Sequence, residues 1–117
     1  MRILVVEDDA LIALDMVGLL EEMGHEVVAE AADACTAWDL AAVGRPDVAL
    51  VDIRLALNTD GGTLARKLYD ELGVRSLFVS GSITEDFRKA MQTIQPLGFL
   101  GKPVTRRTLD DALRELA

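Results

Sequence analysis

The sequence predicts an α/β fold: a doubly wound parallel sheet of five strands in the order 2-1-3-4-5, with helices on both faces. Short apolar runs alternate with amphipathic stretches five times along the 117 residues, and repeated strand–helix units build parallel sheets with right-handed connections. The runs at residues 3–6 and 48–51 are apolar throughout, which is typical of strands buried on both faces. We therefore expect one domain over residues 1–117, with a strand order that is common for such units.

The predicted strands are short segments rich in Val, Leu, Ile and Phe, which favour a pleated and buried backbone. They cover residues 2–6, 26–30, 47–52, 75–79 and 98–100. Gly24, Pro46 and Gly73 stand shortly before three of them, and residues of these types commonly interrupt regular structure. The breaks therefore support the strand assignments.

Five helices are predicted from the spacing of apolar residues and from side chains that cap helix starts. They cover residues 10–23, a stretch from Asp33 to about Val43, residues 64–72, and stretches that begin at Thr84 and Thr105. In the last two helices, the residues expected to face the core are Phe87, Ala90, Met91, Ile94, Leu109, Ala112, Leu113 and Leu116.

Composition limits the classes of partner. Twelve basic and twenty acidic residues give a net charge of −8, which argues against direct nucleic-acid binding because phosphate contacts need a basic surface. The single cysteine, Cys35, cannot form an internal disulfide. The longest uncharged stretch, residues 90–101, is shorter than the roughly 20 residues of a spanning helix. We expect a cytoplasmic protein with no membrane partner and no direct nucleic-acid partner.

Acidic side chains follow two of the predicted strands. Residues 7–9, Glu-Asp-Asp, come directly after the first strand, and Asp52 closes the third. In the order 2-1-3-4-5 these strands are neighbours, and ligands bind outside the carboxyl ends of such strands. Carboxylates held close together raise each other's pKa unless a cation lies between them. The pattern predicts a divalent metal site, with Asp52 as the reactive carboxylate, although Asp9 fits a helix cap better than a metal ligand.

Two further polar groups end the fourth and fifth strands. Ser80 follows residues 77–79, and Lys102 follows residues 98–101. Mg²⁺ prefers oxygen ligands, a carboxylate can attack phosphorus to form an acyl phosphate, and a hydroxyl and an ammonium can bind the phosphoryl oxygens. The four strand ends thus predict phosphoryl transfer. The residues alone leave open whether Ser80 binds a ligand or caps a turn.

The whole chain resembles a response-regulator receiver domain, the phospho-accepting part of two-component signalling, which has a flavodoxin-like fold. The resemblance rests on five motifs in order: the strand and acidic pair at residues 3–8, then Asp52, Ser80, Phe99 and the pair Lys102-Pro103. Each motif alone is weak, whereas all five at compatible spacings are specific.

The resemblance implies a role for each acidic residue. Asp52 would accept the phosphoryl group, Asp8 would bind Mg²⁺ directly, and Glu7 would reach the metal through water. Arg54 would supply a backbone carbonyl as a further metal ligand.

The resemblance also assigns the residues at the other two strand ends. Ser80 and Lys102 would contact the phosphoryl group, and the bond between Lys102 and Pro103 would be cis. Phe99 would be the aromatic residue that switches position, although its pattern is equally that of a plain core residue.

Two segments depart from the usual family pattern. After Asp52 the chain has Ala56 where proline is common, and the Asp-Gly pair at residues 60–61 comes one residue late. The geometry of this loop and the start of the third helix therefore stay open. Residues 78–82, Phe-Val-Ser-Gly-Ser, resemble the Phe-Ala-Thr-Gly-Tyr variant receivers of some bacterial stress-response circuits, with Ser82 in place of tyrosine.

The resemblance implies protein partners. A histidine kinase or a histidine phosphotransfer protein would donate the phosphoryl group. A downstream protein, or a second copy of the chain, would bind the face made by the fourth helix, fifth strand and fifth helix. The basic residues expected on this face are Arg88, Lys89, Arg106 and Arg107. No output segment is visible, so output either passes through a partner or belongs to a longer regulator.

Two other function classes remain. The first is a Mg²⁺-dependent phosphohydrolase of the haloacid dehalogenase type, which needs a second acid two residues after its nucleophile, where this chain has Arg54. The second is an interaction module that works without phosphorylation, or a flavodoxin-like cofactor binder. A flavin site would need a phosphate-binding loop and flanking aromatics, but Trp38 and Tyr69 fall on predicted helices.

Overall fold

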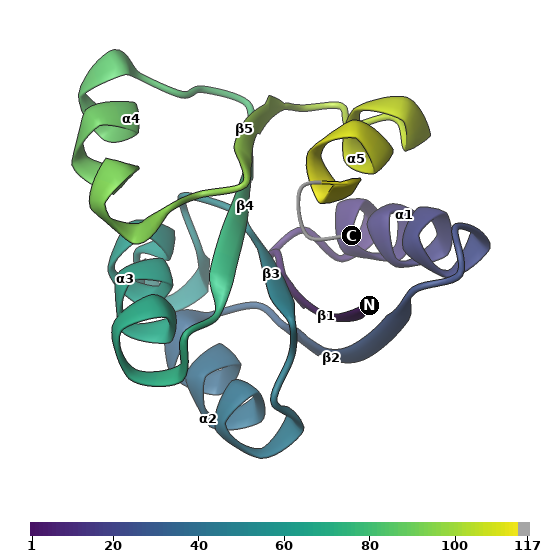
Figure 1. The fold of residues 1–117 in the computed structure, drawn as a ribbon, viewed down its shortest axis with the longest axis horizontal. Helices are drawn as coiled ribbons and strands as arrows, with labels where there is room; N and C mark the ends of the chain where they lie inside the picture. The colour runs from purple at the N-terminus through teal and green to yellow at the C-terminus, as the bar shows by residue number, and fades with distance from the viewer. Residues whose placement is uncertain (115–117) are drawn as a thin grey trace.

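The computed structural model describes residues 1–114 and confirms the predicted sheet. Five parallel strands lie in the order β2-β1-β3-β4-β5 (Figure 1). Their bounds are β1 Arg2–Val6, β2 Glu26–Ala31, β3 Val48–Val51, β4 Arg75–Ser80 and β5 Gly98–Gly101. The helices are α1 Ala10–Glu22, α2 Ala34–Gly44, α3 Gly61–Leu72, α4 Glu85–Met91 and α5 Arg106–Leu113, with short 3-10 turns at Ala56–Asn58 and Gln92–Ile94.

Helices cover both faces of the sheet because successive strand side chains point to opposite sides. In β1, Ile3 and Val5 pack with α1 and α5, whereas Leu4 and Val6 pack with α2 and α3. Helix α4 also packs on the side of α2 and α3, through Met91. Residues 3–6 of β1 and all of β3 are therefore apolar, as the sequence predicted, and Figure 1 shows α1 and α5 together on one side of the sheet.

Side-chain caps fix where the helices beside the strand ends begin. Asp9 accepts hydrogen bonds from the backbone N–H groups of Leu11 and Ile12 at the start of α1. Asp60 does the same for the N–H groups of Gly62 and Thr63 at the start of α3. These caps satisfy backbone donors that have no partner inside the helix. Helix α3 therefore starts at the Asp-Gly pair, which settles a point that the sequence left open.

The prediction for the fourth helix is wrong in one respect. Phe87 is half-buried and Met91 and Ile94 are buried, but Ala90 is exposed. Phe87 and Met91 are four residues apart and share the inward face of α4, whereas Ala90 lies at the edge of that face; the winding changes to 3-10 only after Met91. In the last helix, Leu109 and Leu113 are buried as predicted, and Leu116 lies outside the described residues.

The helices of residues 1–114 are all too short or too polar to cross a membrane.

Candidate functional site

The strand register brings four chain segments to one edge of the sheet. Val6 of β1 pairs with Val51 of β3, so the segments after these strands start side by side. The Asp52 N–H donates to the carbonyl of Val6 over 3.0 Å. On the other side, Ser80 of β4 pairs with Gly101 of β5. The predicted convergence of the strand ends is therefore present.

Three carboxylates meet at this edge. One oxygen each from Glu7, Asp8 and Asp52 lies within 4.8 Å of the others. Glu7 and Asp52 are only 4% and 8% exposed, whereas Asp8 is exposed. Two buried carboxylates so close together need a compensating positive charge.

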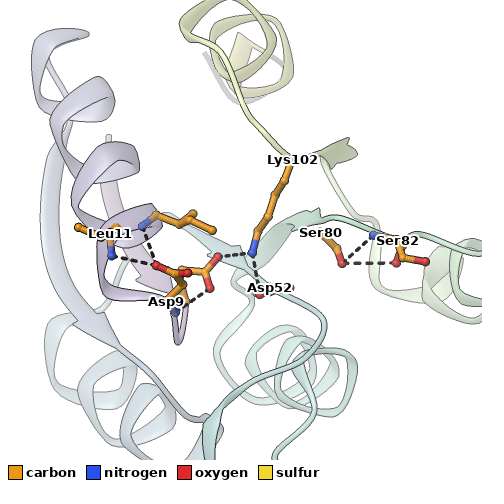
Figure 2. Close-up of polar contacts among 8 residues, drawn as sticks. Asp9, Leu11, Asp52, Ser80, Ser82 and Lys102 are labelled. Atoms are coloured by element: carbon orange, nitrogen blue, oxygen red, sulfur yellow. Dashed lines mark hydrogen bonds and ion pairs between the residues drawn. The ribbon is translucent and has the colours of Figure 1, made fainter.

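Lys102 supplies that charge. Its Nζ lies 2.9 Å from Asp52 Oδ2 and 2.5 Å from Glu7 Oε1, and Figure 2 shows the side chain reaching from the segment after β5 toward Asp52. The Lys102 N–H donates to the Ser80 carbonyl, and the bond from Lys102 to Pro103 is cis, as predicted. We call the group of Glu7, Asp52 and Lys102 the carboxylate corner.

The pKa values of this corner follow from burial and pairing. Burial raises the pKa of Glu7 above its ordinary value, and the ion pair with Lys102 and the hydrogen bond from the Asp9 N–H only partly offset that effect. Burial alone would lower the pKa of Lys102, but its close pairing with Glu7 and Asp52 and their negative charges outweigh burial and raise it. The ammonium therefore stays charged at neutral pH.

The carboxylates fit a hard divalent cation. All three donors are oxygens, which Mg²⁺ prefers. Glu7 Oε1 is buried and, within residues 1–114, receives no hydrogen bond of favourable geometry, despite its ion pair with Lys102. A buried carboxylate oxygen without a hydrogen bond can still bind a cation. Arg54 lines the same crevice, and the role of its carbonyl stays a prediction.

Asp9 does not join the cluster. Its carboxylate caps α1, and its N–H donates to Glu7 Oε2 over 3.0 Å. This agrees with the interpretation of Asp9 as a cap. Its N–H therefore helps to fix the Glu7 side chain at the site.

Ser80 lines the crevice but is turned toward its own turn. Its hydroxyl donates to the Ser82 carbonyl over 3.4 Å and accepts from the Ser82 N–H over 3.3 Å. Figure 2 shows this pair to one side of Lys102 and Asp52. Both hydrogen bonds are long and therefore weak. Ser80 thus caps a turn here, and its contact with a phosphoryl group stays a prediction.

The role of Gly61 at the site was not predicted. A Cβ atom at Gly61 would overlap the carbonyl oxygen of Asp52 and would lie 2.9 Å from Val51 Cγ1. The Gly61 N–H donates to the carbonyl of Ile53 over 2.8 Å. The start of α3 is therefore pressed against the backbone of Asp52. The signal in the sequence was the Asp-Gly pair, but only the fold shows what the glycine approaches.

A cluster of three phenylalanines adjoins the site through β4 and β5. Phe78 pairs with Phe99 across the two strands, and their rings are stacked at 5.5 Å. Phe87 of α4 meets both rings edge-on, at 5.0 and 6.2 Å. Arg88 places its guanidinium carbon 4.9 Å from the centre of the Phe99 ring. We call these four residues the aromatic corner.

The fold and the acidic crevice define a class, the receiver domains of response regulators. A sequence model of the response regulator receiver domain matches residues 3–114. The chain belongs to this family. The predicted resemblance and the predicted flavodoxin-like fold are thereby confirmed.

Two curated relatives show the same relation. The transcriptional regulatory protein PdtaR of Mycobacterium tuberculosis (strain ATCC 25618 / H37Rv) is 32% identical over 120 residues, which cover 99% of this chain and 56% of the relative. The phyllosphere-induced regulator PhyR of Methylorubrum extorquens is 34% identical over 80 residues, which cover 68% of this chain and 30% of the relative. The chain thus spans about half, or less, of the length of these relatives.

Solved structures agree in fold. The signal receiver domain of a modulated diguanylate cyclase from Desulfovibrio desulfuricans G20 has a TM-score of 0.89 and 31% identity. The match covers 97% of this chain and 90% of that domain.

Proposed function

We propose that this receiver domain takes a phosphoryl group from a histidine kinase or a histidine phosphotransfer protein onto Asp52, and that the phosphorylated form changes partner binding. The observation that carries the proposal is the carboxylate corner. Together with Asp8, it places two buried carboxylates, one exposed carboxylate and an ammonium within reach of one crevice. This is the chemistry that phosphoryl transfer to an aspartate requires.

The transfer follows from the positions of the chain's own groups. One Asp52 oxygen attacks phosphorus, the bond from phosphorus to the donor nitrogen breaks, and the imidazole leaves with the electron pair and takes up a proton. Lys102, which now pairs with Asp52 Oδ2, then pairs with a phosphoryl oxygen. Glu7, Asp8, Asp52 and the Arg54 carbonyl would hold Mg²⁺, which would supply positive charge to neutralise the phosphoryl oxygens.

The proposed domain is a phosphoacceptor with no other turnover than its own phosphorylation and dephosphorylation. A phosphohydrolase of the haloacid dehalogenase type would need a carboxylic acid two residues after Asp52, to protonate the leaving group. Arg54 occupies that position and is exposed, and a guanidinium does not give up its proton at ordinary pH.

The proposed output begins at Ser80. An aspartyl phosphate adds charge and acceptor oxygens at Asp52, and the Ser80 hydroxyl has only two long hydrogen bonds to give up. Movement of Ser80 toward the phosphoryl group would open space near Phe99 and alter the face of α4, β5 and α5. The basic residues Arg88, Lys89, Arg106 and Arg107 are exposed on these elements.

Intact mass after incubation with acetyl phosphate and Mg²⁺ tests the chemistry. The parent chain should gain one phosphoryl group, Asp52→Asn should gain none, and Lys102→Ala should gain less. Asp70→Asn, an exposed change on α3, removes the same charge away from the crevice and should react like the parent. A phosphoryl group located on Ser80 or His25, with Asp52→Asn unaffected, would refute the mechanism.

Amide hydrogen exchange tests the output route. Phosphorylation should change exchange within residues 80–110, and Phe99→Ala should remove the effect on partner binding while phosphorylation persists. Changes confined to α1 and α2 would show that the signal leaves by another face.

A further inference from the structure

The Phe99 ring is held largely by helix α4. Phe99 is only partly buried on β5, and two aromatic rings and one guanidinium contact its ring. Phe78 stacks on it from β4, whereas Phe87 and Arg88 are consecutive residues of α4. Its position therefore depends on side chains that lie at the surface as well as on the core.

Arg88 is the exposed member of this group. Within residues 1–114 no carboxylate lies at ion-pair distance from its guanidinium, which lies over the ring of Phe99 instead. A guanidinium over an aromatic face is attracted by the negative charge of that face. At exposed sites such contacts change an equilibrium by about two- to fivefold.

The backbone of α4 is anchored independently of Arg88. Arg66 of α3 donates to the carbonyl of Ala90 over 2.8 Å and to the Thr93 hydroxyl over 3.0 Å. Phe87 packs so closely on α3 that a Cβ at Gly62 would lie 3.0 Å from its ring. Because the helix itself is fixed at both points, the Arg88 side chain is the part of this contact that is free to change.

We propose that Arg88 is a positioning residue that holds the Phe99 ring in the place described here. Loss of its contact raises the ratio of other ring positions to this position about two- to fivefold. A partner that presents a carboxylate at the α4–β5 surface competes for the guanidinium and releases the ring. Binding of such a partner and displacement of Phe99 then favour each other, because coupling between two equilibria is reciprocal. The switching role of Phe99 rests on the function proposed above, whereas the hold of Arg88 on the ring does not.

Fluorine NMR tests the hold directly. The chain has three phenylalanines, so uniform 4-fluorophenylalanine labelling gives three signals, which single Phe→Leu changes assign. Arg88→Met keeps an unbranched, flexible side chain but removes the guanidinium and its charge, and Arg88→Lys keeps the charge. We expect Arg88→Met to shift the Phe99 signal, Arg88→Lys to restore most of the parent position, and Lys89→Met, the matched change at the neighbouring exposed cation, to leave the signal in place.

Acetyl phosphate and Mg²⁺ supply the second arm, with intact mass to count phosphoryl groups. Phosphorylation should move the Phe99 signal of the parent. Before phosphorylation, the ratio of the displaced to the original ring position should be about two- to fivefold higher in Arg88→Met than in the parent. A Phe99 signal that is unchanged in Arg88→Met, or shifted equally by Lys89→Met, would overturn the inference. Absence of any gain in mass would refute the proposed function, while a shift specific to Arg88→Met would still support the hold on the ring.

Discussion

The carboxylate corner and the aromatic corner lie on adjoining strands but are held by different forces. In the carboxylate corner, buried charges compensate one another, so removal of one group leaves another uncompensated at high cost. In the aromatic corner, partly exposed rings and one guanidinium make contacts that are individually small. The difference teaches that the reactive groups are fixed in place, whereas the neighbouring surface can change at little energetic cost.

Gly61→Ala gives the largest expected effect, because it pushes α3 against the backbone of Asp52. A Cβ there overlaps the Asp52 carbonyl, and overpacking of this kind costs about 3 kcal/mol of unfolding free energy. Urea unfolding measures the loss. The matched control is Gly18→Ala on α1, where nothing lies within 4 Å of the added carbon, and it should gain about 0.5–1 kcal/mol. A loss below 1 kcal/mol at Gly61 would mean that the site is not rigid.

Mg²⁺ bound at the carboxylate corner should stabilise the folded chain. A ligand that binds only the folded chain adds about 1.4 kcal/mol when its concentration is ten times Kd. Thermal unfolding with and without Mg²⁺ should show a rise in Tm that Asp8→Asn removes. Asp70→Asn, which removes a charge on the exposed surface of α3, should keep the full rise. An equal response in all three proteins would place the metal elsewhere.

Strand β4 has two serines, Ser76 with its hydroxyl in the core and Ser80 with its hydroxyl at the crevice. Ser76 is 1% exposed, and its Oγ has no hydrogen-bond partner in residues 1–114. Removal of such a hydroxyl by Ser76→Ala should raise the unfolding free energy by about 1 kcal/mol. Ser80→Ala loses only two long hydrogen bonds and should change stability less. If Ser76→Ala instead lowers the unfolding free energy measured in urea, the Ser76 hydroxyl has a hydrogen-bond partner, such as a buried water.

Glu7→Gln should change the pH dependence of the unfolding free energy, and this effect should be smaller than those above. Because burial raises the pKa of Glu7 above its reference value of 4.5, the folded chain binds this proton more tightly than the unfolded chain. The stability that Glu7 contributes is thus complete below pH 4.5 and is lost as pH rises through the folded pKa. In EDTA, the stability of Glu7→Gln relative to the parent should therefore increase with pH over this window. A constant difference between pH 4.5 and 8 would contradict the raised pKa.

The sequence determined the fold and most of the crevice. Strands apolar along their whole length require helices on both faces, and this requirement placed the acids after β1 and β3 at neighbouring positions. Asp52, Glu7 and Lys102 follow their strands directly, so their convergence depends on strand order alone. The same local logic identified Asp9 as a cap, because capping is a contact between near neighbours in the chain.

Tertiary structure decided what depends on contacts between distant segments. The approach of Gly61 to the Asp52 carbonyl and the place of Arg88 over the Phe99 ring each depend on how a helix or loop packs. Spacing along the chain fixes which face a residue occupies within one element, but the angle and depth at which elements meet are set by side-chain packing, which no local pattern records.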